Sequence, residues 1–202
     1  MDNNYKYKTI SEPAKGIYKE KGSKFIAFAY PVYDENEIKL IVAQIKKEYF
    51  DARHHCYAYR LGIAGKIFRA NDDGEPSGTA GRPIYGQMLS FDITNVLIVV
   101  VRYFGGIKLG TSGLINAYKT ATADAIKNST IIEKTEQQVI AFRFSYSVMN
   151  DIMKLIKEEK IEISEQSMEL DCYMKIKTDK NKTVTVLEKL SKIESVIIQS
   201  QC

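Results

Sequence analysis

The sequence predicts an α+β protein made of two units, an expectation that rests on residue distribution and on the order of elements. All 12 glycines lie at or before Gly113 and all 4 prolines at or before Pro83, so the two parts of the chain differ in construction. The later part alternates strand, helix, strand, strand, helix, strand, which is the split βαβ order of ferredoxin-like folds. We therefore expect domains over residues 1–132 and 133–202.

The first unit begins with alternating strand and helix patterns. Residues 24–32 mix β-branched and aromatic side chains and predict a strand. Asp34 and Glu37 form a capping box ahead of a helix whose apolar residues recur at helical spacing. Residues 52–61 alternate as a strand, and residues 66–70 form the second arm of its hairpin.

A central strand and a packed helix follow. Residues 95–101 are apolar on both faces, which is typical of a strand buried on both sides. Residues 114–127 predict a helix, in which three alanines spaced by four give a smooth face for close packing on a sheet. The second unit is expected to follow as strand 138–147, helix 150–160, strand 161–164, strand 169–178, helix 183–192 and strand 196–200.

Positive charge is concentrated in the first unit. Residues 1–130 carry 18 basic and 13 acidic side chains, a net charge of +5, and five of the six arginines lie between Arg53 and Arg102. This charge is compatible with nucleic-acid binding and equally with an ordinary solvated surface.

Cysteine usage and hydropathy indicate the compartment. Cys56, Cys172 and Cys202 are widely spaced and form no C-x-x-C pair, which argues against a disulfide framework or a zinc ribbon and fits a reducing cytosol. No apolar leader follows Met1, and the longest aliphatic run, residues 96–101, is far too short to span a bilayer. We expect a cytoplasmic protein with no membrane partner and with neither a metal nor another cofactor.

Residues 72–83 have the most unusual composition in the chain, with three carboxylates, three glycines, two prolines and two hydroxyls. Such a segment is either a surface loop or the wall of a site. Its carboxylates could hold Mg²⁺ through oxygen ligands, or they could cap turns and accept backbone N–H bonds. The residues of this motif loop are Asp72, Asp73, Gly74, Glu75, Pro76, Gly78, Thr79 and Gly81.

A second Gly-rich segment, residues 99–113, joins the central strand to the following helix. Thr111 or Ser112 is expected to cap that helix, so its backbone N–H groups and dipole would converge on the loop as in an anion site. The alternative is that the glycines only permit a tight turn and close packing. Arg102 should emerge at the strand end, facing the loop, where it serves a phosphate or a carboxylate. The loop is not a Walker A motif, because Thr111 stands where lysine is required and Lys108 is displaced from that position.

Arginines interleave with aromatic residues in the first unit, and this combination suits single-stranded or looped RNA. No Ser–His–Asp or Cys–His pair can be assigned, and His54 and His55 point to opposite faces of one strand. We predict that the two Gly-rich segments lie side by side in one surface groove. The candidate nucleic-acid or anion-binding residues are Arg60, Arg82, Arg102, Tyr103, Gly105, Gly106, Lys108, Gly110 and Thr111.

Three segments, residues 52–60, 72–83 and 99–113, together resemble the Impact/YigZ family in its bacterial two-domain form. Ser77, Arg82 and Ser112 stand at positions where relatives vary. The resemblance implies a first domain of the ribosomal-protein S5 domain-2 type, a sheet with two helices on one face. It implies a second, ferredoxin-like domain similar to domain V of elongation factor G.

The resemblance also implies a link to translation. Eukaryotic members act there by binding an activator of a stress-responsive kinase, a role that requires a further N-terminal domain and is not transferred to this chain. We expect a non-enzymatic, cytoplasmic protein associated with RNA or the ribosome. The alternatives are a metal-assisted enzyme on a phosphate-bearing substrate, with Asp72, Asp73 and Glu75 holding the metal, and a module that binds a protein partner.

Overall fold

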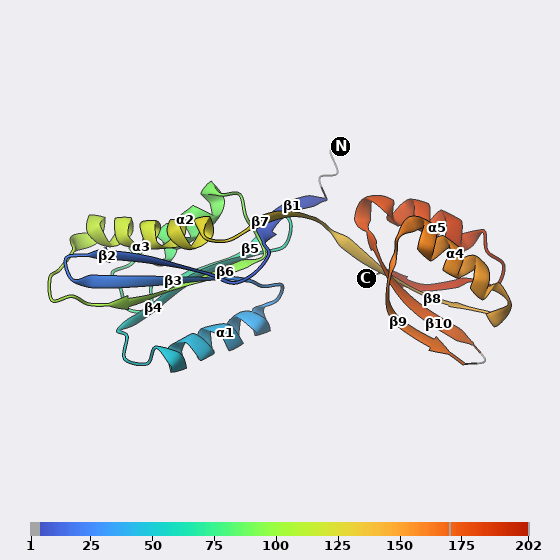
Figure 1. The fold of residues 1–202 in the computed structure, drawn as a ribbon, viewed down its shortest axis with the longest axis horizontal. Coiled ribbons are helices and arrows are strands. Elements are labelled where there is room, and N and C mark those ends of the chain that lie inside the picture. The colour runs from blue at the N-terminus through green and yellow to red at the C-terminus, as the bar shows by residue number, and fades with distance from the viewer. Residues whose placement is uncertain (1–4, 170, 202) are drawn as a thin grey trace. The chain divides into compact units, whose positions relative to one another are not determined.

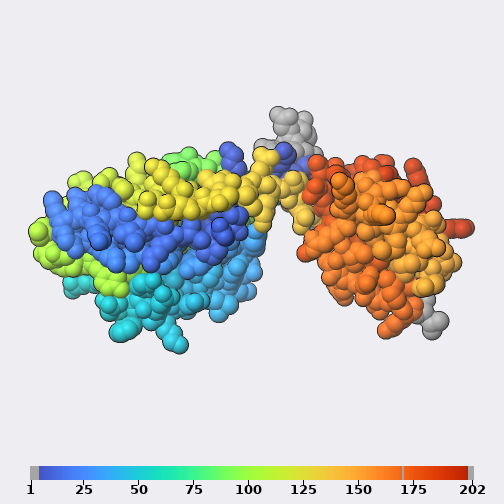
Figure 2. All heavy atoms as spheres, in the orientation of Figure 1, coloured from blue at the N-terminus to red at the C-terminus, as the bar shows by residue number. Residues whose placement is uncertain are grey.

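The computed structural model describes residues 5–169 and 171–201. The chain divides into one unit over Lys6–Lys134 and a second that runs from Thr135 and includes Tyr5. This division falls two residues after the expected boundary at 132/133. In Figure 2 the first unit is coloured from blue to yellow and the second from orange to red. In the described part of the chain, no helix is both long and apolar enough to span a bilayer.

The first unit is organised around a five-stranded antiparallel sheet. Its strand order is β2-β3-β6-β4-β5, where the strands span Ala14–Glu20 (β2), Ser23–Pro31 (β3), Val96–Tyr103 (β6), His54–Leu61 (β4) and Ile67–Asn71 (β5). Strand β6 lies in the middle and is buried from Val96 to Arg102, as its apolar run predicts. A separate pair is formed by β1 (Lys6–Ile10) and β7 (Ile131–Thr135).

Helices cover both faces of this sheet (Figure 1). Helices α2 (Gly81–Ser90) and α3 (Gly110–Lys127) lie on one face, and α1 (Glu35–Glu48) lies on the other. Because side chains alternate along a strand, β6 contributes Ile98 to the core beneath α3 and Val99 to the core beneath α1. The central strand therefore stabilises two cores at once.

Asp34 caps α1 as predicted, while the Glu37 carboxylate bonds the residue before the N-cap in place of the N-cap itself. Asp34 accepts hydrogen bonds from the backbone N–H groups of Asn36 and Glu37, and the Glu37 carboxylate accepts one from Tyr33 N. The same reasoning does not find α2, which begins inside the segment expected to be a loop. Its N-cap residue, Ala80, has no capping side chain. The carboxylate of Asp72, far earlier in sequence, accepts from the N–H groups at the start of the helix instead.

The second unit has the predicted order of elements. These are β8 (Gln137–Phe144), α4 (Met149–Glu159), β9 (Glu162–Met168), β10 (Cys172–Asp179), α5 (Thr183–Ser191) and β11 (Ile197–Gln201), with short 3₁₀ turns at Tyr146–Val148 and Lys180–Lys182. The antiparallel sheet order is β11-β8-β10-β9. Phe142 and Ile176 from the two central strands pack with Ile152 of α4 and Leu190 of α5 in its core.

Close packing of α3 on the edge strand β2 depends on Gly16. A Cβ atom at this position would lie 2.2 Å from Ala125 N and 2.8 Å from Ala121 O, which are both backbone atoms of α3. The alanine face of α3 is therefore matched by a glycine on the strand, as its smooth surface predicts.

We expect Gly16→Ala to lower the free energy of unfolding by about 1–3 kcal/mol, because neither backbone can move away without disturbing the sheet or the helix. Gly86→Ala is the matched control, since a Cβ at this interior position of α2 meets nothing within 4 Å. It should raise stability by about 0.5–1 kcal/mol. Urea denaturation of the three proteins tests both values, and a Gly16→Ala protein as stable as the parent would contradict the packing argument.

Candidate functional site

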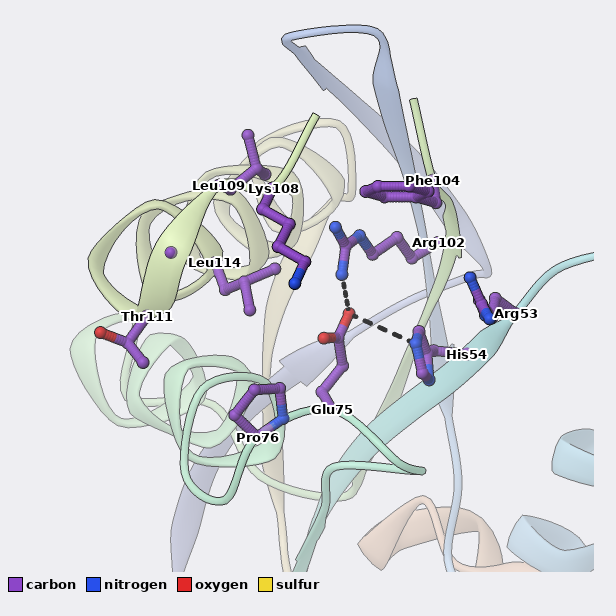
Figure 3. Close-up of a pocket in the computed structure, with 11 residues that line it drawn as sticks. Arg53, His54, Glu75, Pro76, Arg102, Phe104, Lys108, Leu109, Thr111 and Leu114 are labelled. Carbon is purple, nitrogen blue, oxygen red and sulfur yellow. Dashed lines mark hydrogen bonds and ion pairs between the residues drawn. The ribbon is translucent and has the colours of Figure 1, made fainter. Parts of the chain in front are cut away.

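A pocket in the first unit brings the two Gly-rich segments together (Figure 3). Its cavity of about 450 Å³ is lined by Glu75 and Pro76 from the first segment and by Arg102, Phe104 and residues 108–111 from the second. Arg53 and His54 at the start of β4 complete it with Leu114 of α3. The predicted side-by-side placement is therefore observed, because antiparallel pairing of His54 with Arg102 brings both strand ends to one edge.

The floor of the pocket is a buried ion pair. Arg102 Nη1 donates to Glu75 Oε1 at 2.5 Å, and the two side chains are only 7% and 3% exposed. Tyr118 of α3 donates its hydroxyl to the same carboxylate oxygen at 2.8 Å. Arg102, at the end of β6, therefore pairs with a carboxylate of this chain, and the pair fixes the acidic segment, residues 72–83, to β6.

Two aromatic rings hold the guanidinium of Arg102 in place. Its central carbon lies 5.4 Å from the ring centroid of Phe25 and 5.6 Å from that of Phe104, which are cation–π distances. Its Nε is buried and has no hydrogen-bond partner among the residues that the structure describes. The side chain is therefore fixed in position while part of its hydrogen-bonding capacity is unused.

Behind Glu75 the polar network continues into the core. Cys56 Sγ lies 3.3 Å from Tyr118 Oη and 3.0 Å from the carbonyl oxygen of Asp72. Burial raises the pKa of the Cys56 thiol well above its ordinary value, and burial also raises the pKa of the Tyr118 hydroxyl. Both groups are therefore neutral hydrogen-bond donors at physiological pH, and Cys56 has no nucleophilic thiolate.

His54 and His55 face opposite sides of the sheet, as the strand alternation predicts. His54 Nδ1 lies 2.8 Å from the carbonyl oxygen of Asp73, which can only accept, so the proton resides on Nδ1. This leaves His54 Nε2 facing the pocket, 4.0 Å from Glu75 Oε1. His55 Nε2 instead contacts the carbonyl of Tyr49 at 2.9 Å on the α1 side.

Asp72 and Asp73 serve the backbone of the motif loop. Asp72 accepts N–H bonds from Gly78, Ala80 and Gly81 at 2.8–3.0 Å. Burial alone would raise the pKa of Asp72, but these three donors outweigh it and the pKa is lowered. Asp73 accepts from Lys46 Nζ and His55 N; burial would likewise raise its pKa, and these bonds lower it.

The three carboxylates therefore do not converge on a shared point. Glu75 alone of the three lines the pocket, while Asp72 and Asp73 are engaged elsewhere. Within residues 5–169 and 171–201, no group of three or more His, Cys, Asp or Glu side chains is arranged to hold a metal ion. The metal-assisted alternative lacks the ligand set that it requires in this part of the chain.

The start of α3 differs from the sequence expectation. The helix begins at Gly110, four residues earlier than expected, so Thr111 and Ser112 lie in its first turn and do not cap it. The preceding residue, Leu109, has no side chain able to cap. Gly110 adopts φ +73°, a conformation that favours glycine, and both Gly110 and Thr111 line the pocket. The first residues of a long helix, whose N–H groups have no partner within the helix, thus line the cavity.

Gly105 and Gly106 position the loop without lining the cavity. A Cβ at Gly105 would lie 1.9 Å from the carbonyl carbon of Gly22, in the turn between β2 and β3. Gly106 adopts φ +87° and turns the chain toward Lys108. In the other segment Gly74 and Gly78 also have positive φ, and Thr79 and Gly81 are buried against the start of α2. Most glycines of the two motifs therefore position the loops that form the pocket and do not line it themselves.

Three of the predicted arginine and tyrosine residues also lie outside the pocket. Arg60 pairs with Val96 at the opposite end of β6 and donates to the carbonyl of Ile93. Tyr103 follows Arg102 directly, so it points to the α1 face, where its hydroxyl donates to Asp51. Arg82 is exposed in the first turn of α2, outside the cavity lining.

Sequence reasoning missed Arg53 and Phe104 as site residues. Both are exposed and flank the strand ends that meet at the pocket, with Phe104 43% exposed. The pairing of His54 with Arg102 was the missing information, because it places the residues that precede β4 beside those that follow β6.

We expect Asp72→Asn to destabilise the protein by about 1–3 kcal/mol at neutral pH, since the neutral amide offers one acceptor oxygen in place of two. The folded-state pKa of Asp72 is lowered, so its contribution is present above the unfolded pKa of about 3.9 and is lost as pH falls through the folded pKa. The stability difference between parent and variant should therefore shrink in acid. Asp92→Asn, at an exposed position, is the control. A pH-independent difference in urea denaturation would contradict the assignment.

Comparisons with known proteins agree with this architecture. The Impact N-terminal domain matches residues 21–126. The IMPACT family member YvyE of Bacillus subtilis is 32% identical over 177 residues, which cover 86% of this chain and 82% of that protein. A crystal structure described as a hypothetical protein is 27% identical, covers 97% of both chains and has a TM-score of 0.76. The structure of Yih1, described as a two-domain translational regulator, is 26% identical over 60% of this chain and 47% of its own, with a TM-score of 0.36. The chain therefore belongs to the IMPACT family.

Proposed function

We propose that this protein is a non-enzymatic, cytoplasmic RNA-binding protein that acts in translation, and that the pocket of the first unit binds a phosphate group of the RNA. The observation that carries the proposal is the convergence of cationic groups on one cavity. Arg53, Arg102 and Lys108 line it against the single carboxylate of Glu75, and the N-terminus of α3 opens into it.

The arrangement favours binding because its central cation is already fixed. Arg102 is held by Glu75 and by two aromatic rings, so little side-chain freedom is lost when a ligand arrives. Lys108 is exposed and reaches from the loop into the cavity (Figure 3). A fixed guanidinium that lines the cavity and an exposed lysine that reaches into it suit a phosphate that enters from solvent.

The fold class that we propose for the two units supports the same function. We assign the first unit to the ribosomal-protein S5 domain-2 type and the second to the ferredoxin-like type of elongation factor G domain V. Both types occur in translation proteins that contact RNA. The sheet with α2 and α3 on one face and the order of β8 to β11 support these assignments, and α1 is an addition on the opposite face.

We expect Lys108→Ala to weaken the binding of a short single-stranded RNA by about 1–3 kcal/mol, because a charge-assisted contact is lost. The slope of log affinity against log salt should also decrease by about 0.7, the contribution of one phosphate contact on a single strand. Lys127→Ala is the matched control, since it removes the same charge from the far end of α3, the helix that follows Lys108.

Fluorescence anisotropy across a salt series measures both quantities. Absence of RNA binding at low salt would refute the proposal, and equal slopes for the two variants would move the phosphate away from this pocket. Ribosome association that does not respond to salt would indicate a protein contact instead. The edge strand β5, with Ile67 and Phe68 each 56% exposed, is the candidate surface for that alternative.

A further inference from the structure

The pocket places acceptor groups of Glu75 and His54 among cationic residues, and a phosphate alone does not satisfy this arrangement. Glu75 is held as a carboxylate by its ion pair with Arg102, so it can only accept hydrogen bonds. Its Oε1 already accepts from Arg102 and Tyr118, and Figure 3 shows the second oxygen directed into the cavity. A phosphate placed next to Glu75 would be repelled by its negative charge.

His54 adds a second acceptor beside Glu75. With the proton on Nδ1, which donates to the Asp73 carbonyl, the neutral form of the ring presents the lone pair of Nε2 to the pocket. Nε2 lies 4.0 Å from Glu75 Oε1. The deep part of the cavity therefore offers two neighbouring acceptors to a ligand with two neighbouring donors.

The rim has the opposite character. The exposed residues Lys108 and Arg53 line the cavity together with the start of α3. The buried Arg102 guanidinium, whose Nε has no partner among the described residues, lines it as well. Phe104, Leu109 and Leu114 supply apolar wall between the two zones. The complementary ligand has an anionic group at one end, an apolar middle and adjacent hydroxyl donors at the other.

Size restricts the ligand further. A cavity of about 450 Å³ falls within the range of small-molecule pockets, so it admits a single nucleotide. Its floor is closed by Glu75 and Arg102, which are 8% and 6% exposed, with the fully buried Tyr118 behind them. An RNA chain that passed through the pocket would need an exit at this floor, whereas the end of an RNA chain needs none.

We propose that the pocket captures the 3′-terminal ribonucleoside of an RNA, an inference that rests on the proposed RNA-binding function. The terminal 2′,3′-diol donates to Glu75 and His54, and the phosphate that links it to the preceding nucleotide lies at the rim near Lys108 and the start of α3. Acidic side chains recognise ribose hydroxyls in this way in dinucleotide-binding sites. An internal nucleotide is excluded because its 3′ oxygen carries a phosphate.

The experiment compares four RNAs of the same ten-nucleotide sequence by fluorescence anisotropy. One ends in a 2′,3′-diol, one in a 3′-phosphate and one in a 2′,3′-dideoxynucleotide, and the fourth is circular. All carry an internal label, so that both ends stay free. We expect the diol RNA to bind roughly 10- to 150-fold more tightly than the other three, as for the loss of hydrogen bonds to a charged group.

A pair of variants then tests the role of the carboxylate. Glu75→Gln, checked for folding by circular dichroism, should reduce the discrimination between diol and 3′-phosphate, because the repulsive charge is removed. Glu48→Gln, at an exposed position of α1, should retain it. The comparison among RNAs needs no variant, so it decides the proposal even if Glu75→Gln fails to fold.

The outcomes separate this inference from the function on which it rests. Equal binding of the diol and 3′-phosphate RNAs, or full binding of the circle, overturns capture of the 3′ end and leaves RNA binding in place. Failure of all four RNAs to bind at low salt overturns both.

Discussion

The ion pair between Arg102 and Glu75 is the interaction on which the rest of the site depends. It joins the end of the central strand to the acidic Gly-rich segment, and the Tyr118 hydroxyl from α3 donates to the same carboxylate oxygen. Removing two charges from water is costly, and here the pair is supported by that hydroxyl and by the rings of Phe25 and Phe104 beside the guanidinium. Loss of either partner would leave a buried charge, at a cost of about 3–5 kcal/mol, and would remove the floor of the cavity.

The acidic segment divides its carboxylates between two roles. Asp72 organises the segment from within by binding three backbone N–H groups, and Asp73 ties it to α1 through Lys46 and to β4 through His55 N. With the loop held in this way, Glu75 points into the site. A segment rich in glycine and proline, with few apolar side chains to bury, is ordered here by hydrogen bonds to carboxylates.

The whole pocket lies within the matched family domain. Its lining runs from Arg53 to Leu114, inside the matched residues 21–126, so the second unit is not needed to build it. Within that domain, glycines near the cavity are required for two reasons: Gly105 lets the backbone of Gly22 approach closely, and Gly110 adopts a positive φ. The position of the start of α3 at the cavity therefore depends on these glycines.

The features of this protein that depend on local pattern could be predicted from its sequence. An apolar run on both faces identified β6 as central, the Asp34 box placed the start of α1, and periodicity ordered the second unit. Alternation along β6 also separates Arg102 from Tyr103, since neighbouring residues of a strand face opposite sides. Strand pairing, helix α2 and the partners of Asp72 and Glu75 were decided by tertiary structure. The reason is distance along the chain. Arg102 and Glu75 are 27 residues apart, and they meet only because β6 and β5 both pair with β4, in registers that packing selects.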